Sequence, residues 1–285
     1  MKIVFPELDS NDIAREATSH FDDIKWVTAR RLDEATKYVR IGLANSMISG
    51  LDYSSRDVLL AYKDHIPLKS KYFSSCFICQ KGEQTLALAD GGVNKQPTKE
   101  QLYTIVEDTA DTFTKYTGNP PRIAMLSYST YGSGGKNPDL DKIHFVIDEV
   151  SKQHPDWLID GELQLDAAVN PSIASKKTPD SPLGGHANIL ITPDLNSGNI
   201  LYKSLEQFGG FTIAGPIIQG FAVPLADLSR GSTVKDIILT IDVVKTLISR
   251  DRTRLTRSGM SEAPPVTTGG RERVPRNNDL TTSER

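Results

Sequence analysis

Short apolar runs alternate with amphipathic stretches along most of this 285-residue chain. The apolar runs, which we expect to form strands, lie at residues 1–6, 24–28, 44–49, 73–79, 85–89, 123–128, 189–192 and 211–214. In the stretches 99–116, 140–150 and 234–248, apolar residues recur three and four positions apart, which is typical of a helix with one buried face. Strands that alternate with helices predict an α/β fold, and the chain is long enough for two lobes.

The composition is that of a folded protein. Hydrophobic residues make up 38% of the chain and charged residues 24%, which leaves enough apolar material for a core. The 33 Lys and Arg are offset by 36 Asp and Glu, so the net charge of −3 gives no overall basic surface for nucleic acid. No apolar run approaches the ~20 residues of a membrane span, and the N-terminus lacks the pattern of a secretion signal. We therefore expect a cytoplasmic protein that binds neither nucleic acid nor membrane.

The sequence changes character at Asp251. From there to Arg285, Arg, Ser, Thr, Pro and Gly replace the periodic apolar pattern, which predicts a disordered tail over 251–285. Its slightly basic composition is compatible with binding a polyanion and equally with a solvated extension that has no function.

Cys76 and Cys79 are the only cysteines, and their C-x-x-C spacing is found in redox and metal sites. They lie in a run expected to be a strand, where residues three apart point to opposite faces of the sheet. Zinc would also need further ligands, and the five histidines are scattered along the chain without paired spacing. The sequence therefore predicts no metal site.

Four polar segments follow apolar runs, where α/β proteins place their binding loops. They are residues 126–134, 160–166, 193–199 with the following Tyr202-Lys203, and 227–236. Hydroxyl and backbone N–H groups in the first segment suit a phosphate or carboxylate, although a plain turn has the same composition. The three carboxylates of the second suit metal binding, acid/base chemistry or helix capping. No Walker motif, G-x-S-x-G elbow or H-E-x-x-H pattern is present.

The segment 227–236 has the most suggestive chemistry. Arg230 offers a fork of donors for phosphate, Ser229 places a hydroxyl beside it, and Asp236 is a nearby candidate base. The same residues also fit a helix start, with Thr233 as N-cap and Asp236 at the third helical position. The segment alone supports both interpretations.

The ordered part of the chain resembles the phosphate acetyltransferase (phosphotransacetylase) family from residue 3 to about residue 248. The similarity rests on collinear motifs at 3–7, 47–50, 122–130, 160–168, 187–196, 198–203, 215–220 and 227–231. This resemblance implies reversible acetyl transfer between acetyl phosphate and coenzyme A (CoA), with no further cofactor, and subunits that form a homodimer. It also implies a two-lobed, three-layer αβα fold like that of isocitrate and isopropylmalate dehydrogenases, with the site between the lobes. One lobe would comprise residues 1–76 and 219–250, the other residues 77–218.

The resemblance also implies roles for individual residues. Asp236 matches the aspartate that takes the thiol proton of CoA, Ser229 the serine that stabilises the developing oxyanion, and Arg230 the arginine that binds the phosphoryl group. In the same cleft, phosphate or the CoA pantetheine would contact Ser127, Ser129, Thr130 and Ser133, and the facing wall would be built by Asn196, Asn199 and Lys203. The family mechanism requires neither a metal nor a covalent enzyme intermediate.

The chain departs from the family pattern where arginines are expected. Leu60 and Gln207 stand at two such positions, and each loss removes a fixed charge and a bidentate donor. Arg56, one helical turn before Leu60, is a candidate to restore the missing charge. A segment of the usual N-terminal lobe between Pro6 and Lys37 is also missing. Two alternatives therefore stand beside acetyl transfer. They are an acyltransferase for propionyl or butyryl phosphate and a non-catalytic acetyl-CoA-sensing domain.

Overall fold

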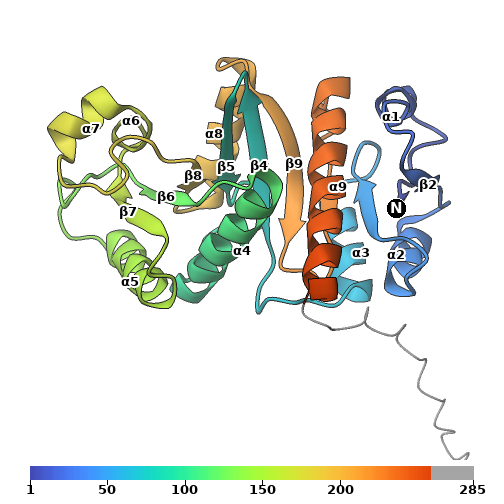
Figure 1. The fold of residues 1–285 in the computed structure, drawn as a ribbon, viewed down its shortest axis with the longest axis horizontal. Helices are drawn as coiled ribbons and strands as arrows, with labels where there is room; N and C mark the ends of the chain where they lie inside the picture. Colours follow the sequence, from blue (N-terminus) through green and yellow to red (C-terminus); the bar gives the residue numbers. More distant parts are fainter. Residues whose placement is uncertain (258–285) are drawn as a thin grey trace, which may run out of the picture.

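The computed structural model describes the backbone of residues 1–257 and the side chains of residues 1–251. Ten strands in the described part form one sheet in the order β2-β1-β3-β10-β9-β4-β5-β8-β6-β7 (Figure 1). Their bounds are β1 Lys2–Val4, β2 Lys25–Val27, β3 Ser46–Ser49, β4 Ser74–Lys81, β5 Gln84–Ala89, β6 Arg122–Leu126, β7 Leu158–Leu163, β8 Ile189–Ile191, β9 Thr212–Gln219 and β10 Leu225–Asp227.

Each end of the sheet is parallel, and antiparallel strands join the two ends. β2, β1, β3 and β10 are mutually parallel, as are β5, β8, β6 and β7. Between them, β9 runs antiparallel to both β10 and β4, and β4 runs antiparallel to β5. Parallel strands need helical crossovers, so each end of the sheet is covered by helices.

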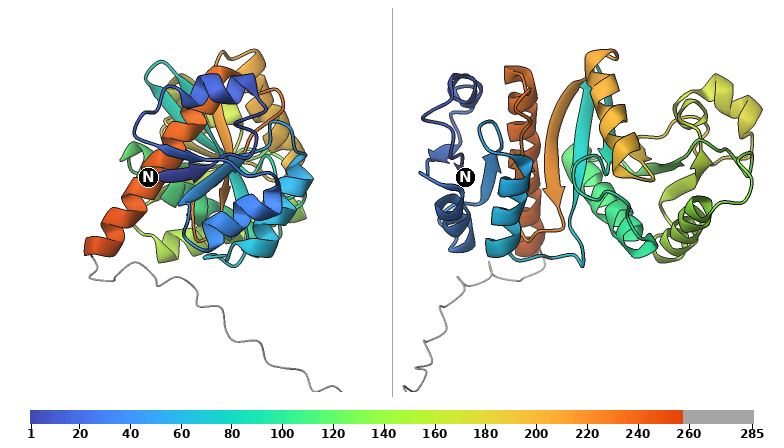
Figure 2. Two further views of the ribbon diagram at one scale, coloured as in Figure 1. Left: turned by 90° about the vertical axis from the view of Figure 1, so that its right-hand side faces the viewer. Right: turned by 180° about the vertical axis from the view of Figure 1, so that it is seen from behind.

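Helices cover both faces of the sheet, as Figures 1 and 2 show, which confirms the predicted three-layer αβα fold. One face carries α1 (Asp12–Thr18), α9 (Val234–Arg257), α4 (Lys99–Thr117) and α5 (Pro138–Gln153). The other carries α2 (Leu32–Arg40), α3 (Ser55–His65), α8 (Leu195–Gln207) and the short α6 (Leu165–Val169) and α7 (Pro171–Lys177). Beneath α1, α9, α4 and α5 the buried core is continuous, whereas on the opposite face it is split into one cluster under α2 and α3 and another under α8.

The eight predicted strands and the three predicted helices are all present. Most ends shift by a few residues, but β9 and α9 continue five and nine residues past their predicted ends. The predicted lobe boundaries at residues 76/77 and 218/219 fall inside β4 and β9, so the sheet is continuous across them and the division stays a prediction. Helix α9 continues to Arg257, six residues past the predicted start of the tail at Asp251. Residues 258–285 lie outside the described part, so the disorder of the tail stays a prediction.

Cys76 and Cys79 lie on β4 as predicted, and both thiols are buried. Burial raises the pKa of Cys79 to about 12, so this thiol stays protonated near neutral pH and is a poor metal ligand. Among the described residues, no group of three or more His, Cys, Asp or Glu side chains is placed to hold a metal ion. No helix in the same part of the chain is long and apolar enough to cross a membrane.

Candidate active site

The loops after β3 and β10 are in direct contact because these two strands are paired. The N–H of Leu228 donates to the carbonyl of Ser49 at 2.6 Å. Gly50 has φ +113°, and a Cβ there would lie 2.4 Å from the Leu228 carbonyl. Only glycine fits this backbone conformation and this close approach. The contact brings the start of α3 beside the segment that contains Ser229 and Arg230.

The Ser229–Ser232 segment is a tight turn between β10 and α9. The N–H of Ser229 donates to the Ser232 hydroxyl at 3.1 Å, and the N–H of Gly231 donates to the Ser229 hydroxyl at 3.2 Å. Arg230 is exposed, and among the described residues its guanidinium has no hydrogen bond or ion pair. The turn therefore presents an uncommitted positive charge beside a hydroxyl group that it holds in place.

Asp236 is buried at the start of α9, and both its carboxylate oxygens are occupied. Oδ1 accepts from the N–H of Ile213 at 3.0 Å, and Oδ2 accepts from the N–H and hydroxyl of Thr233 at 2.8 and 2.6 Å. The N–H of Asp236 donates back to the Thr233 hydroxyl at 3.3 Å, so the predicted capping contacts are present. As a proton acceptor, Asp236 would have to exchange one of these donors for the substrate.

Arg56 lies in the first turn of α3, next to the contact between the two loops. Its side chain is exposed and, within the described part of the chain, has no ionic partner. Leu60, one turn further along the same face, is 46% exposed and is therefore not needed to fill the core. Arg56 and Arg230 are thus two uncommitted cations, one in the first turn of α3 and one in the turn after β10.

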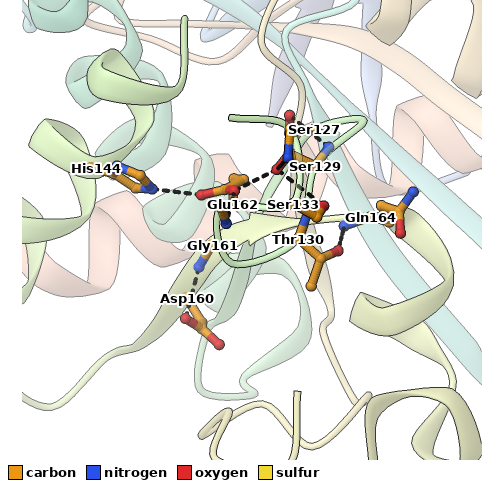
Figure 3. A network of polar contacts seen from close by, with 11 residues as sticks. Ser127, Ser129, Thr130, Ser133, His144, Asp160, Gly161, Glu162 and Gln164 are labelled. Atoms are coloured by element: carbon orange, nitrogen blue, oxygen red, sulfur yellow. Dashed lines mark hydrogen bonds and ion pairs between the residues drawn. The ribbon is translucent and has the colours of Figure 1, made fainter. Parts of the chain in front are cut away.

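Figure 3 shows that the hydroxyl-rich loop after β6 is built around a buried carboxylate, Glu162 of β7. Ser129 Oγ donates to Oε1 at 2.7 Å, and the N–H of Gly132 donates to the same oxygen at 2.7 Å. His144 of α5 lies 2.6 Å from Oε2. Ser133 Oγ accepts from the N–H of Thr130 at 2.9 Å and lies 3.3 Å from Ser129 Oγ. Two of the loop donors that were expected to bind an anion, the Ser129 hydroxyl and the Gly132 N–H, therefore already bind the protein's own carboxylate.

The charge on Glu162 is stabilised by these contacts. Burial opposes ionisation, but hydrogen bonds from Ser129, the Gly132 N–H and His144 outweigh it and lower the pKa of Glu162 to about 2. The ordinary value is 4.5, so the ionised group contributes stability above about pH 4.5 and loses it as the pH falls towards about 2.

Glu162→Gln is expected to lower the free energy of unfolding at pH 7 by up to about 3 kcal/mol, the equivalent of this pKa difference. Its deficit relative to the parent protein should shrink as the pH falls from about 4.5 to about 2. Urea unfolding across that range measures both quantities. Glu149→Gln, which removes a partly exposed carboxylate paired with Lys152, is the control and should change stability by less than about 1 kcal/mol. A deficit in Glu162→Gln that stays constant with pH would contradict the electrostatic explanation.

The carboxylates of residues 160–166 have separate local roles. Asp160 accepts a hydrogen bond from the Tyr131 hydroxyl at 2.6 Å and another from Ser181. Asp166, in the first turn of α6, pairs with Lys177 at 2.8 Å. Of the alternatives open for this segment, the structure shows a helix-start position for Asp166, whereas Glu162 anchors the loop after β6, which was not predicted.

The remaining predicted substrate-binding residues belong to the loop after β6 or to α8. The Ser127 hydroxyl accepts from the N–H of Ser129 at 3.2 Å, and the Thr130 hydroxyl accepts from the N–H of Gln164 at 2.9 Å. On α8, Asn199 donates to the Gly91 carbonyl at 3.1 Å, whereas Asn196 and Lys203 are exposed. Lys203 Nζ lies 4.9 Å from the centre of the Tyr202 ring.

The structure brings together some of the predicted site residues and separates others. Ser229, Arg230, Asp236 and Arg56 lie around the adjoining ends of β3, β10 and α9. Ser127–Ser133 follow β6, and four strands separate β6 from β10 in the sheet. At a spacing of about 4.8 Å between strands, these loops are roughly 24 Å apart along the sheet. A substrate that contacts both groups would therefore have to be long, and their joint role stays a prediction.

Two buried carboxyl groups beneath the Ser229–Arg230 turn were missed by the sequence reasoning. Glu7, after β1, accepts from the N–H of Gly50 at 2.7 Å and from the Ser49 hydroxyl at 3.0 Å. Asp227, the last residue of β10, is 2% exposed. Both follow apolar residues at the carboxyl end of a strand and lie in the motifs 3–7 and 227–231, so the sequence marked their positions but not their burial.

Comparison with known proteins gives the same family along most of the chain. The phosphate acetyl/butaryl transferase family model matches residues 13–244. The phosphate acetyltransferase of Thermoanaerobacterium thermosaccharolyticum is 40% identical over 261 residues, covering 85% of this chain and 78% of that protein. The phosphate acetyltransferase of Clostridium acetobutylicum is 40% identical over 217 residues, covering 73% of this chain and 65% of its own length.

Among solved structures, a phosphotransacetylase from Streptococcus pyogenes superposes with a TM-score of 0.78 at 29% identity, covering 87% of this chain and 94% of that one. The chain spans less than two thirds of several curated relatives that it matches, down to 24% of the Escherichia coli phosphate acetyltransferase. A family model that covers most of the chain, together with relatives at 40% identity, establishes the relationship. The chain belongs to the phosphate acetyl/butaryl transferase family.

Proposed function

We propose that this chain catalyses the reversible transfer of an acetyl group between acetyl phosphate and coenzyme A. The observation that supports this most directly is the turn between β10 and α9, where an uncommitted Arg230 lies beside Ser229 at the start of a long helix. A guanidinium fork and a helix N-terminus both favour a phosphate anion. The relatives are named phosphate acetyltransferases, and that name includes the phosphate group.

In the proposed reaction, the CoA thiol gives its proton to Asp236, and the resulting thiolate attacks the acetyl carbonyl carbon. The carbon–oxygen bond to phosphate then breaks, and phosphate leaves with the bonding electrons. A free thiol is only a few per cent thiolate at about pH 7, so a positioned base raises the reactive fraction. Ser229 stabilises the charge that develops on the carbonyl oxygen, and Arg230 binds the phosphoryl group. As written, the transfer uses no metal and no covalent enzyme intermediate.

The test is acetyl-CoA formation from acetyl phosphate and CoA by the purified protein, followed by thioester absorbance. Propionyl and butyryl phosphate are assayed in parallel. Turnover of acetyl phosphate supports the proposal. A higher kcat/KM for propionyl or butyryl phosphate would instead make the longer acyl phosphate the preferred substrate. The sensor alternative is favoured by the occupied oxygens of Asp236 and by the missing arginines at Leu60 and Gln207. No turnover with any acyl phosphate, together with measurable acetyl-CoA binding, would establish that alternative.

Arg56→Ala is expected to weaken acetyl phosphate binding by about 10-fold, because it removes one of two uncommitted cations at the site. The matched control is Lys63→Ala, which removes the same charge two turns further along α3 and should leave the affinity within about 2-fold. The KM for acetyl phosphate and the inhibition constant of phosphate measure the effect. Equal KM values and equal inhibition constants in the parent protein and Arg56→Ala would show that Arg56 does not bind the phosphoryl group.

The family resemblance also leads us to propose that the protein acts as a homodimer in the cytoplasm. Light scattering at micromolar concentration tests the first part and cell fractionation the second. A monomer that retains full activity would show that the site is complete within one chain.

A further inference from the structure

Asp227 immediately precedes the Leu228–Arg230 segment and is almost fully buried. Among the described residues, its Oδ1 atom has no hydrogen-bond donor. A Cβ on Gly50 would lie 2.5 Å from that oxygen, so the loop after β3 packs tightly against the carboxyl group. An ionised carboxylate in such a place lacks the donors that normally stabilise a buried charge.

The nearby donors are already used by a second buried carboxyl group. Glu7 accepts from the N–H of Gly50 and from the Ser49 hydroxyl. These two residues are at the end of β3, the strand between β1 and β10. Two carboxylates that share one buried region repel each other when both are ionised. One of the pair is thus favoured in its neutral form, and Asp227 is the one with an unpartnered oxygen.

We propose that Asp227 is a positioning residue of this site and must be uncharged for the Ser229–Arg230 turn to bind a phosphate dianion. This inference rests on the proposed function, which places the phosphoryl group at Arg230. A negative charge on Asp227, three residues before Arg230 in the chain, repels the dianion and thereby lowers its affinity.

The titration of Asp227 falls in the physiological range. Burial raises the pKa of Asp227 to about 7, the Ser55 hydroxyl opposes this shift, and the charge of Glu7 adds to it. The charged or titratable groups on the elements around Asp227 are Glu7 after β1, Asp52 and Tyr53 in the loop after β3, Arg56, Asp57, Tyr62, Lys63, Asp64 and His65 on α3, and Lys235 and Asp236 in the first turn of α9. Tyr62 stays neutral because burial raises its pKa well above the ordinary value. Its hydroxyl donates to the Ala226 carbonyl and is not a donor to Asp227 Oδ1.

The probe for the test is inorganic sulfate, which is a dianion throughout the relevant range and does not itself titrate. Calorimetry measures its affinity for the full chain between about pH 6 and pH 8.5. We expect the affinity of the parent protein to fall by about 10-fold as the pH rises through about 7. Asp227→Asn, which is neutral at every pH, should bind with nearly constant affinity over the same range.

Two further variants make the result specific. Asp57→Asn removes an exposed carboxylate from the first turn of α3 and should retain the pH dependence of the parent protein. Arg230→Ala should abolish sulfate binding, which would show that sulfate binds at the Ser229–Arg230 turn. Constant affinity in the parent protein, or an unchanged pH dependence in Asp227→Asn, would overturn the inference. Acetyl-CoA formation is measured in the same preparations, and its absence counts against the proposed function, not against the role of Asp227.

Discussion

Asp236→Asn is expected to reduce kcat for acetyl-CoA formation by about 10²-fold or more, the usual effect of removing a general base. Asparagine keeps the size of the side chain and one carbonyl oxygen that can accept from the Ile213 N–H, but it cannot take a proton from the CoA thiol. Because Asp236 also caps α9, a loss of activity in this variant has two possible causes, a lost proton acceptor and a destabilised helix start. Steady-state kinetics with saturating substrates and thermal unfolding of the same samples measure catalysis and stability together.

Thr233→Ala separates the two roles of Asp236. It removes the hydroxyl that donates to Asp236 Oδ2 at 2.6 Å and leaves the carboxylate in place. Loss of this N-cap should cost about 1 kcal/mol of stability, with kcat reduced by only a few-fold. If Asp236→Asn and Thr233→Ala lose similar activity and similar stability, Asp236 serves only to start the helix, and the proton acceptor must be sought elsewhere in the turn.

Arg230→Ala is expected to raise the KM for acetyl phosphate by about 10- to 100-fold. The variant loses a charge-assisted, bidentate contact to a dianion, and such contacts contribute about 1.5–3 kcal/mol. Since the guanidinium has no partner in the described part of the protein, its removal should leave the free energy of unfolding nearly unchanged. Separate KM values for acetyl phosphate and CoA show whether the loss is confined to the phosphoryl group.

Arg31→Ala is the control for Arg230→Ala. Arg31 is exposed and paired with Asp33 at 3.0 Å, so the variant removes the same charge outside the turn. It should leave both KM values within about 2-fold, because exposed ion pairs contribute little. A similar rise in KM in both variants would mean that overall charge, rather than a contact at Arg230, controls binding.

Most of the sheet could be predicted because its strands are apolar runs separated by clear helical periodicity. The strands β7 and β10 could not. β7 contains Asp160, Gly161 and Glu162, and it forms a strand because the loop after β6 supplies donors for the buried charge. β10 has only three residues and gains its partners from distant parts of the sequence, with Ala226 opposite Ile48 and Ile217. Neither form of compensation is visible in the local sequence.

The same distinction applies to the site. Ser229, Arg230 and Asp236 could be grouped from sequence because they belong to one continuous turn and helix start. The position of Arg56 beside them depends on the pairing of β3 with β10. The loop after β6 has the composition of an anion site, and it does surround an anion, but that anion is Glu162 from the neighbouring strand. Composition indicated the kind of group bound and could not identify its source.

The continuity of the sheet limits how this protein can admit and release its substrates. The two ends of the sheet are joined without a break through β10, β9, β4 and β5, and the central strands β4 and β9 are held by a ladder from Ser74–Gln219 to Gln80–Thr212. A hinge usually consists of a few loop residues that absorb large changes in φ and ψ, and hydrogen-bonded strands resist such changes. Opening by rotation about a flexible linker is therefore disfavoured. Access to the turn that carries Arg230 is instead governed by the loops and side chains at its rim, which can move in nanoseconds to microseconds.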